Sequence, residues 1–211
     1  MESSSTIEVS RRGFMRNALV ASAVAAFASA AWGARPTSAA ADTASDAEAT
    51  AEYVQELPAA DSTTDWTFLD GVHDEYLRAV ETFPFPLPDG YVFPSKSRWR
   101  EPAGEANVRF SIGTGGAEAY MFWAGACSTA AFAAYRRGDA DRAEFLLGTL
   151  EEGLRSSLHP MYVVDPDMVF INDTIVPATH GDYSALRGAC IDPFIADPVC
   201  RSIAASAGDR F

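Results

Sequence analysis

The chain has 211 residues, 48% of them hydrophobic and 21% charged, and its formal net charge is −13. This length fits one domain, and the apolar content is enough to build a core, which excludes a wholly disordered chain. The acidic balance repels phosphate backbones and anionic lipid, so nucleic acid is not an expected partner.

The first 41 residues have the ordered regions of an export signal. An uncharged, alanine-rich run extends from Ala18 to Trp32, and Ala39-Ala40-Ala41 forms a cleavage-type sequence ahead of Asp42. The basic region before them reads Ser10-Arg11-Arg12-Gly13-Phe14-Met15. Its paired Arg11 and Arg12, followed by Phe14, resemble a twin-arginine translocation signal. The resemblance implies a prokaryotic protein that is exported already folded, sometimes with a cofactor or with a partner that carries one.

Export would bring the protein to the twin-arginine machinery first and then to the cell envelope, the periplasm or the exterior. Cleavage after Ala41 would remove four arginines and two glutamates, leaving 12 basic and 27 acidic residues and a net charge of −15. An uncleaved membrane anchor is the alternative. Its apolar run of 15 residues is shorter than the roughly 20 needed to span a bilayer, so membrane contact is expected only if the signal is retained.

Three further segments follow the signal. Residues 42–64 are rich in Ala, Ser, Thr and Asp and are predicted to form a disordered linker, in which Tyr53-Val54 is the main bulky pair. A single helical domain is predicted over 65–203 and a disordered tail over 204–211.

The domain begins with a predicted amphipathic helix and a proline-rich strap. Asp65 suits the N-cap, and apolar residues then recur at three- and four-residue steps as far as Phe83. The segment Phe83-Pro84-Phe85-Pro86-Leu87-Pro88 forbids helix and predicts an extended strap. We expect it to cover the core; a docking motif for another protein is the alternative.

A polar, basic stretch from Ser95 to Arg109 comes next and is interpreted as an exposed loop, with an anion site as the alternative. A short strand is predicted over 108–112. Gly113 to Gly116 then form a glycine-rich entry to a helix, which predicts a hinge. Phosphate binding at this turn is the alternative, although no P-loop lysine follows.

The strongest prediction is a helical hairpin over 117–158. The helix over Glu118–Tyr135 has no charge between Ala119 and Tyr135, so it should be buried on all sides. Gly138 suits the left-handed C′ position, and Asp139 suits the N-cap of a second, amphipathic helix from Ala140 to Leu158.

A weaker second hairpin is predicted around Gly181-Asp182, which repeats the Gly138-Asp139 pair. Asp165-Pro166 suits a helix start, and the spacing of apolar residues favours a helix that ends at Pro177, with a strand as the alternative. A short helix is expected over Tyr183–Cys190. The predicted fold is therefore mostly α: a small bundle of two antiparallel helix hairpins with a proline- and aromatic-rich extended strap.

Cysteines and histidines are the candidate chemical groups. We predict a disulfide between Cys127 and Cys190; a Cys190–Cys200 bond and the absence of any bond are the alternatives. His73, His159 and His180 form no metal-ligand pair of recognisable spacing, so no metal or cofactor is assigned. His180 suits the C-terminus of a helix.

No catalytic motif is recognisable, and the sequence therefore favours a binding or accessory protein, such as a small partner of an exported redox enzyme in the cell envelope. The alternative is a small secreted metal-dependent hydrolase that uses His73, His180 and nearby carboxylates.

Overall fold

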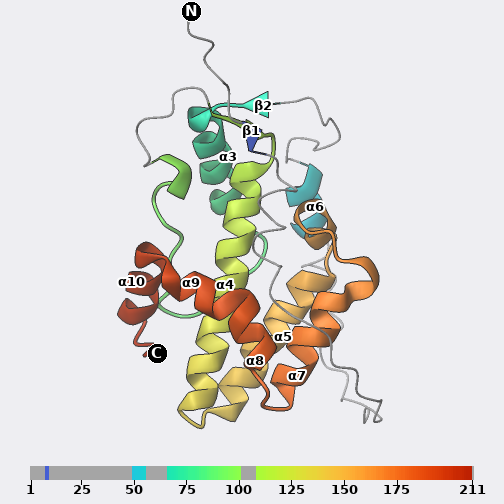
Figure 1. Cartoon of the computed structure of the whole chain (residues 1–211), viewed down its shortest axis with the longest axis vertical. Coiled ribbons are helices and arrows are strands. Elements are labelled where there is room, and N and C mark those ends of the chain that lie inside the picture. The colour runs from blue at the N-terminus through green and yellow to red at the C-terminus, as the bar shows by residue number, and fades with distance from the viewer. Residues whose placement is uncertain (1–7, 10–48, 56–65, 101–107, 211) are drawn as a thin grey trace, which may run out of the picture.

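A computed structural model describes residues 8–9, 49–55, 66–100 and 108–210 (Figure 1). Most of these residues are helical, which confirms the predicted mostly α fold. The principal helices are α3 (Leu69–Glu81), α4 (Thr114–Arg136), α5 (Ala140–Arg155), α6 (His159–Tyr162), α7 (Val176–Thr179), α8 (Ser184–Leu186), α9 (Asp192–Ala196) and α10 (Pro198–Ser206).

Helix α4 runs through the centre of the molecule, as its uncharged sequence predicts (Figure 1). From Thr114 to Ala131 every residue except Met121 is buried. Helices α3 and α5 pack along α4, and the C-terminal helices α9 and α10 also contact it. The many alanines of α4 let these neighbours approach closely, and α4 supplies more buried hydrophobic residues than any other helix.

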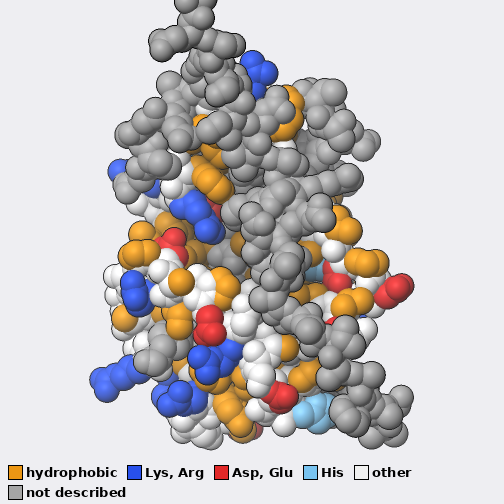
Figure 2. Space-filling view, in the orientation of Figure 1, with side chains coloured by type: hydrophobic (Ala, Val, Ile, Leu, Met, Phe, Trp, Pro, Cys, Tyr) orange, Lys and Arg blue, Asp and Glu red, His pale blue; other side chains and the backbone are white. Residues whose placement is uncertain are grey.

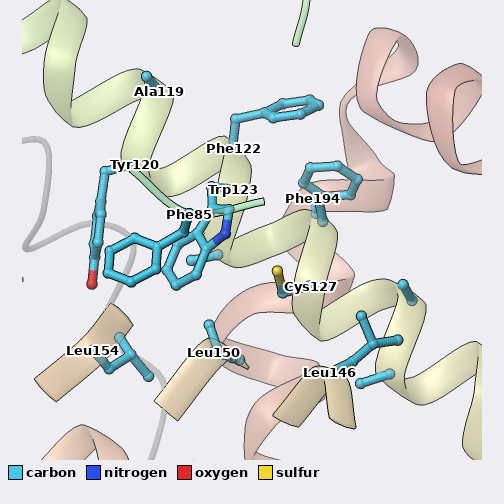
Figure 3. Close-up of a cluster of buried hydrophobic side chains, with 14 of the residues drawn as sticks. Phe85, Ala119, Tyr120, Phe122, Trp123, Cys127, Leu146, Leu150, Leu154 and Phe194 are labelled. Atoms are coloured by element: carbon cyan, nitrogen blue, oxygen red, sulfur yellow. The ribbon is translucent and has the colours of Figure 1, made fainter. Parts of the chain in front are cut away.

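The α4–α5 hairpin follows the predicted turn chemistry. Gly138 has a φ of 77°, which suits glycine because a side chain is disfavoured there. The Asp139 side chain accepts a hydrogen bond from the backbone N–H of Arg142 at 3.1 Å and so caps α5. Helix α5 buries its leucine stripe against α4; Leu146, Leu150 and Leu154 lie opposite Trp123 and Cys127 in Figure 3.

A small sheet lies beside the N-terminal ends of α3 and α4. Strand β3 (Arg109–Ser111) pairs in parallel with β1 (Glu8–Val9) and antiparallel with β2 (Trp66–Thr67), which confirms the predicted strand over 108–112. Because Trp66 and Thr67 pair with this strand, α3 begins at Leu69 rather than after Asp65 as predicted.

The strap covers the core, as expected. Phe85 is buried with its ring 5.1 Å from that of Trp123. The indole Nε1–H of Trp123 donates to the carbonyl of Pro86 at 3.1 Å. The strap is thereby fastened to α4 by both an apolar and a polar contact.

The second hairpin is helical, but two of its turns are wider than α-helical turns. In the π-helical segments η3 (Ile171–Ile175) and η4 (Arg187–Ile191), backbone N–H groups bond five residues back, from Val176 to Ile171 and from Asp192 to Arg187. Each segment precedes a proline by two residues, Pro177 or Pro193. Proline lacks an N–H and its ring clashes with the carbonyl four residues earlier, and the wide turn accommodates both effects.

The helix therefore continues through Pro177 to Thr179, and the prediction that it ends at Pro177 was wrong. The second helical stretch likewise continues beyond Cys190 as α9. The turn between the two follows the prediction: Gly181 has a φ of 90°, and the Asp182 carboxylate accepts from the N–H of Ser184 at 3.0 Å.

Two predicted disordered segments are structured where they are described. Residues 49–55 of the predicted linker form a helical turn whose Tyr53 is buried against Phe83, with ring centroids 5.8 Å apart. In the predicted tail, α10 extends to Ser206, and Asp209 is buried and hydrogen-bonded to Tyr91. Apolar and hydrogen-bonding partners distant in sequence order both segments.

Candidate functional site

A buried hydrogen-bonded chain of three side chains is the most distinctive polar feature of the described residues. Tyr120 lies on α4, His159 begins α6, and Asp165 lies in the loop that follows. The Tyr120 hydroxyl is 2.7 Å from Nδ1 of His159, and Nε2 of His159 is 3.3 Å from Oδ2 of Asp165. All three side chains are almost fully buried.

The local sequence positions His159 and Asp165, which both follow α5. The Ser156 hydroxyl accepts from the N–H of Leu158, and Pro160 suits the first turn of the short helix α6, which begins at His159. The other carboxylate oxygen of Asp165 accepts from the backbone N–H of Phe170 at 3.0 Å. Both acceptor atoms of Asp165 are therefore engaged, and the carboxylate is fixed in place.

The chemistry of the partners assigns the protons. An ionised carboxylate only accepts, so Nε2 of His159 carries the proton and donates to Asp165. Nδ1 then has a free lone pair and accepts from the Tyr120 hydroxyl. Burial lowers the pKa of His159, opposed by the hydrogen bond to Asp165, and burial raises the pKa of Tyr120 well above its usual value. Both side chains are neutral at pH 7.

A base oriented by a carboxylate and pointed at a hydroxyl is the arrangement that activates nucleophiles in hydrolases. Here, however, the hydroxyl is that of Tyr120, which is only 1% exposed. Its neighbours are aromatic: Trp123 and Tyr162 have ring centroids 5.8 Å and 5.5 Å away, and Phe85 lies beside them (Figure 3). The arrangement can take up the phenolic proton, but it offers no open face to a substrate.

A second buried polar cluster joins α3, α4 and the basic segment after the strap. Glu118 accepts from the Ser97 hydroxyl at 2.6 Å and from the Arg98 N–H at 2.7 Å. His73 accepts from the Ser97 N–H through Nδ1 at 3.3 Å. Burial raises the pKa of Glu118, partly offset by these hydrogen bonds. The cluster holds residues 97–98 against the helices, which is a structural role.

The glycine-rich start of α4 already holds an anionic group. Oε2 of Glu75, from α3, accepts from the N–H groups of Gly113 and Gly115 at 3.0 and 3.1 Å. A carboxylate is thus supplied by the protein where phosphate was considered as an alternative. The turn forms the entry to α4, and its role as a hinge stays a prediction.

The predicted disulfide is not formed, because Cys127, Cys190 and Cys200 are all free thiols. Cys190 packs against the edge of the core, and Cys127 lies in the apolar cluster of α4 and α5 (Figure 3). The Cys190–Cys200 alternative is not formed either. Burial raises the pKa of all three thiols, which disfavours the reactive thiolate.

The two histidines of the hydrolase alternative are not brought together. His73 is buried on α3, whereas His180 is exposed at the end of α7, and these helices lie at opposite ends of the molecule (Figure 1). Nδ1 of His180 lies 2.8 Å from the carbonyl of Val176 at its helix end, the position that the sequence suggested. Within the described ranges, no group of three or more His, Cys, Asp or Glu side chains could hold a metal ion.

The export-signal residues Arg11, Arg12 and Phe14 lie outside the described residues. Among the helices that are described, none is both long and apolar enough to cross a membrane.

Sequence reasoning missed the Tyr120–His159–Asp165 chain. His159 and Asp165 are close in sequence, and the adjoining prolines mark ordered turns, but nothing local connects them to Tyr120, which lies 39 residues before His159.

No family model, curated protein or solved structure matches the chain.

Proposed function

We propose that this protein is an exported binding or accessory protein that docks on another protein through the loop Val163–Phe170. The observation that carries the proposal is the exposure of three apolar side chains in this loop: Val164 is 77% exposed, Val169 48% and Met168 42%. Exposed apolar side chains grouped in one loop are typical of interaction sites.

The loop is held in an unusual conformation. Asp167 and Met168 have φ values of 59° and 53°, and left-handed backbone at residues other than glycine costs about 1–3 kcal/mol each. Three contacts hold the loop: both oxygens of Asp165 are hydrogen-bonded, and Nη1 of Arg155 donates to the Met168 sulfur at 3.3 Å. The apolar side chains are therefore pre-positioned, which lowers the entropy cost of binding.

Charge around the loop defines the chemistry of the partner. Asp167 and Asp173 are exposed, and Arg155, a basic residue that contacts the loop, is paired with Glu151 at 2.8 Å. Figure 2 shows hydrophobic and acidic side chains side by side at the right edge, where the segment after α6 projects in Figure 1. The complementary surface is an apolar pocket with a basic rim.

The twin-arginine-type signal supports a specific form of this proposal. A protein that folds before export can leave the cytoplasm already bound to its partner, and an exported redox enzyme is such a partner. In that form the loop Val163–Phe170 would be in place on the partner before translocation.

Site-specific photo-crosslinking in the native host tests the docking loop. A photoreactive amino acid at position 164 should give one discrete adduct with an envelope protein, and Val169→Asp should abolish it. The matched control is the same amino acid at Val199, another valine, which lies on α10 and is 54% exposed. Identical adducts from positions 164 and 199, or none from 164, would contradict the proposal.

Export is tested separately. Arg11→Lys combined with Arg12→Lys should retain the full-length protein in the cytoplasm, as measured by cell fractionation and immunoblotting. The exported wild-type protein should begin at Asp42 by N-terminal sequencing. Unchanged export of the double variant would show that the twin arginines are not the signal.

A further inference from the structure

The proposed docking function leaves the proton acceptor beside Tyr120 unexplained. We propose that Tyr120 is a redox-active tyrosine, which loses an electron to a one-electron oxidant and its phenolic proton to Nδ1 of His159. In this step the O–H bond of Tyr120 breaks and an N–H bond forms on His159. The products are a neutral tyrosyl radical, an imidazolium and the reduced oxidant, and reduction of the radical returns the proton.

The geometry matches the requirements of this step. Removing an electron from a phenol makes its hydroxyl strongly acidic, so oxidation is favourable only where a base can take the proton at once. Nδ1 of His159 is 2.7 Å from the Tyr120 oxygen, within direct transfer distance. The imidazolium that forms stays paired with the carboxylate of Asp165, which compensates its charge inside the core.

Two other buried tyrosines, Tyr76 and Tyr91, donate to weaker proton acceptors. The Tyr76 hydroxyl donates to the carbonyl of Pro94 at 2.7 Å, and a backbone carbonyl cannot keep the proton. The Tyr91 hydroxyl donates to Asp209 at 2.7 Å, but that carboxylate also accepts from Arg137. A carboxylate is in any case a weaker base than imidazole by about 2–3 pKa units.

An electron path to Tyr120 exists through neighbouring oxidisable rings. Trp123 and Tyr162 lie within 6 Å of its ring centroid, and Tyr162 in turn neighbours the Tyr53 hydroxyl. These rings are themselves buried, so an electron from Tyr120 would reach an oxidant by transfer through the packed core. Burial of Tyr120 would also keep solvent away from the radical and prolong its lifetime.

The position of Asp165 connects this site to the docking loop. Asp165 belongs to the loop Val163–Phe170 and also orients His159, so a partner bound there would lie close to the proton acceptor. The redox inference nevertheless rests on the buried geometry alone and is tested without a partner.

Flash photolysis tests the inference on the full-length protein. A photogenerated ruthenium(III) polypyridyl complex serves as the one-electron oxidant, and the trapped radical is measured by electron paramagnetic resonance. All variants carry Tyr135→Phe, because Tyr135 is 46% exposed and the oxidant could reach it directly, whereas the other six tyrosines are buried. A tyrosyl signal should form in this background and fall at least tenfold when Tyr120→Phe is added.

Tyr76→Phe is the matched control, since it also removes a buried phenol, and it should leave the signal unchanged. His159→Gln keeps Tyr120 but removes the base, and should lower the radical yield to the level of Tyr120→Phe. If His159→Gln does not fold, Asp165→Asn, which weakens the proton acceptor, should slow radical formation at least threefold. A signal of equal size in the Tyr120→Phe variant would overturn the inference.

Discussion

His159 and Glu118 are buried ionisable residues whose pKa values move in opposite directions. Burial lowers the pKa of His159 from 6.5, so the folded protein binds its proton less readily than the unfolded chain. Burial raises the pKa of Glu118 from 4.5, which makes the fold bind that proton more readily. The two groups therefore change the free energy of unfolding in opposite senses as the pH changes.

For His159 the sign is definite. Its contribution to stability is complete above pH 6.5 and is lost as the pH falls through the lower pKa of the folded state. Denaturation in urea between pH 7.5 and 5 should show this loss in the wild type and a flatter profile in His159→Gln. His180→Gln, at an exposed histidine, is the control and should follow the wild type. If the free energy of unfolding of His159→Gln fell with pH as steeply as that of the wild type, His159 would not be the source of the loss.

Two glycines of α5 provide a matched test of packing. A Cβ at Gly153 would collide with the Trp123 ring, whereas one at Gly148 would meet nothing within 4 Å. Gly153→Ala should lower the free energy of unfolding by about 1–3 kcal/mol through overpacking. Gly148→Ala should raise it by about 0.5–1 kcal/mol through helix propensity. Denaturant titration measures both, and equal effects would show that Trp123 does not constrain α5.

At the scale of elements, the α4–α5 hairpin depends on the cap at its turn. Asp139→Ala removes the acceptor for the Arg142 N–H and should cost about 1 kcal/mol in the free energy of unfolding. Asp141→Ala is the control, because Asp141 is exposed in the same turn without capping the helix. Comparable losses from the two variants would indicate a dipole effect of charge rather than the cap.

The two π-helical turns show how proline acts within the C-terminal helices. Pro177 is predicted to end its helix because proline usually does so. Neighbouring helices hold the backbone on either side, however, and η3 and η4 widen instead of breaking. Each proline thus widens the preceding helical turn, and the chain remains helical on both sides of it.

At the scale of the whole molecule, the C-terminal segment is part of the core structure. Asp209 accepts from the buried Tyr91 hydroxyl at 2.7 Å and from Nη1 of Arg137 at 2.8 Å, so it connects the end of the chain to the segment after the strap and to the C-terminal end of α4. Asp209→Ala should lower the free energy of unfolding by about 2 kcal/mol, mainly because the Tyr91 hydroxyl would lose its partner. Thermal denaturation by circular dichroism measures this.

Arg210→Ala, at the exposed adjacent position, is the control and should change the stability little. A neutral Asp209→Ala variant would show that the hydrogen bonds of Asp209 do not stabilise the fold.

The sequence by itself determined the elements whose causes are local. The burial of α4 follows from its uncharged composition, the hairpin turn from Gly138 and Asp139, and the strap from three alternating prolines. Each of these depends on residues within a few positions of one another, where propensity and capping act directly.

Only the tertiary structure decided which distant groups meet. Tyr120 and His159 are 39 residues apart, and Tyr91 and Asp209 are 118 apart. The cap on α4 comes from Glu75, 38 residues before Gly113. Such pairs form because the packed helices bring buried polar groups together and each group must find a partner away from water. A single sequence carries no local signal of that pairing, so the candidate site became visible only in the fold.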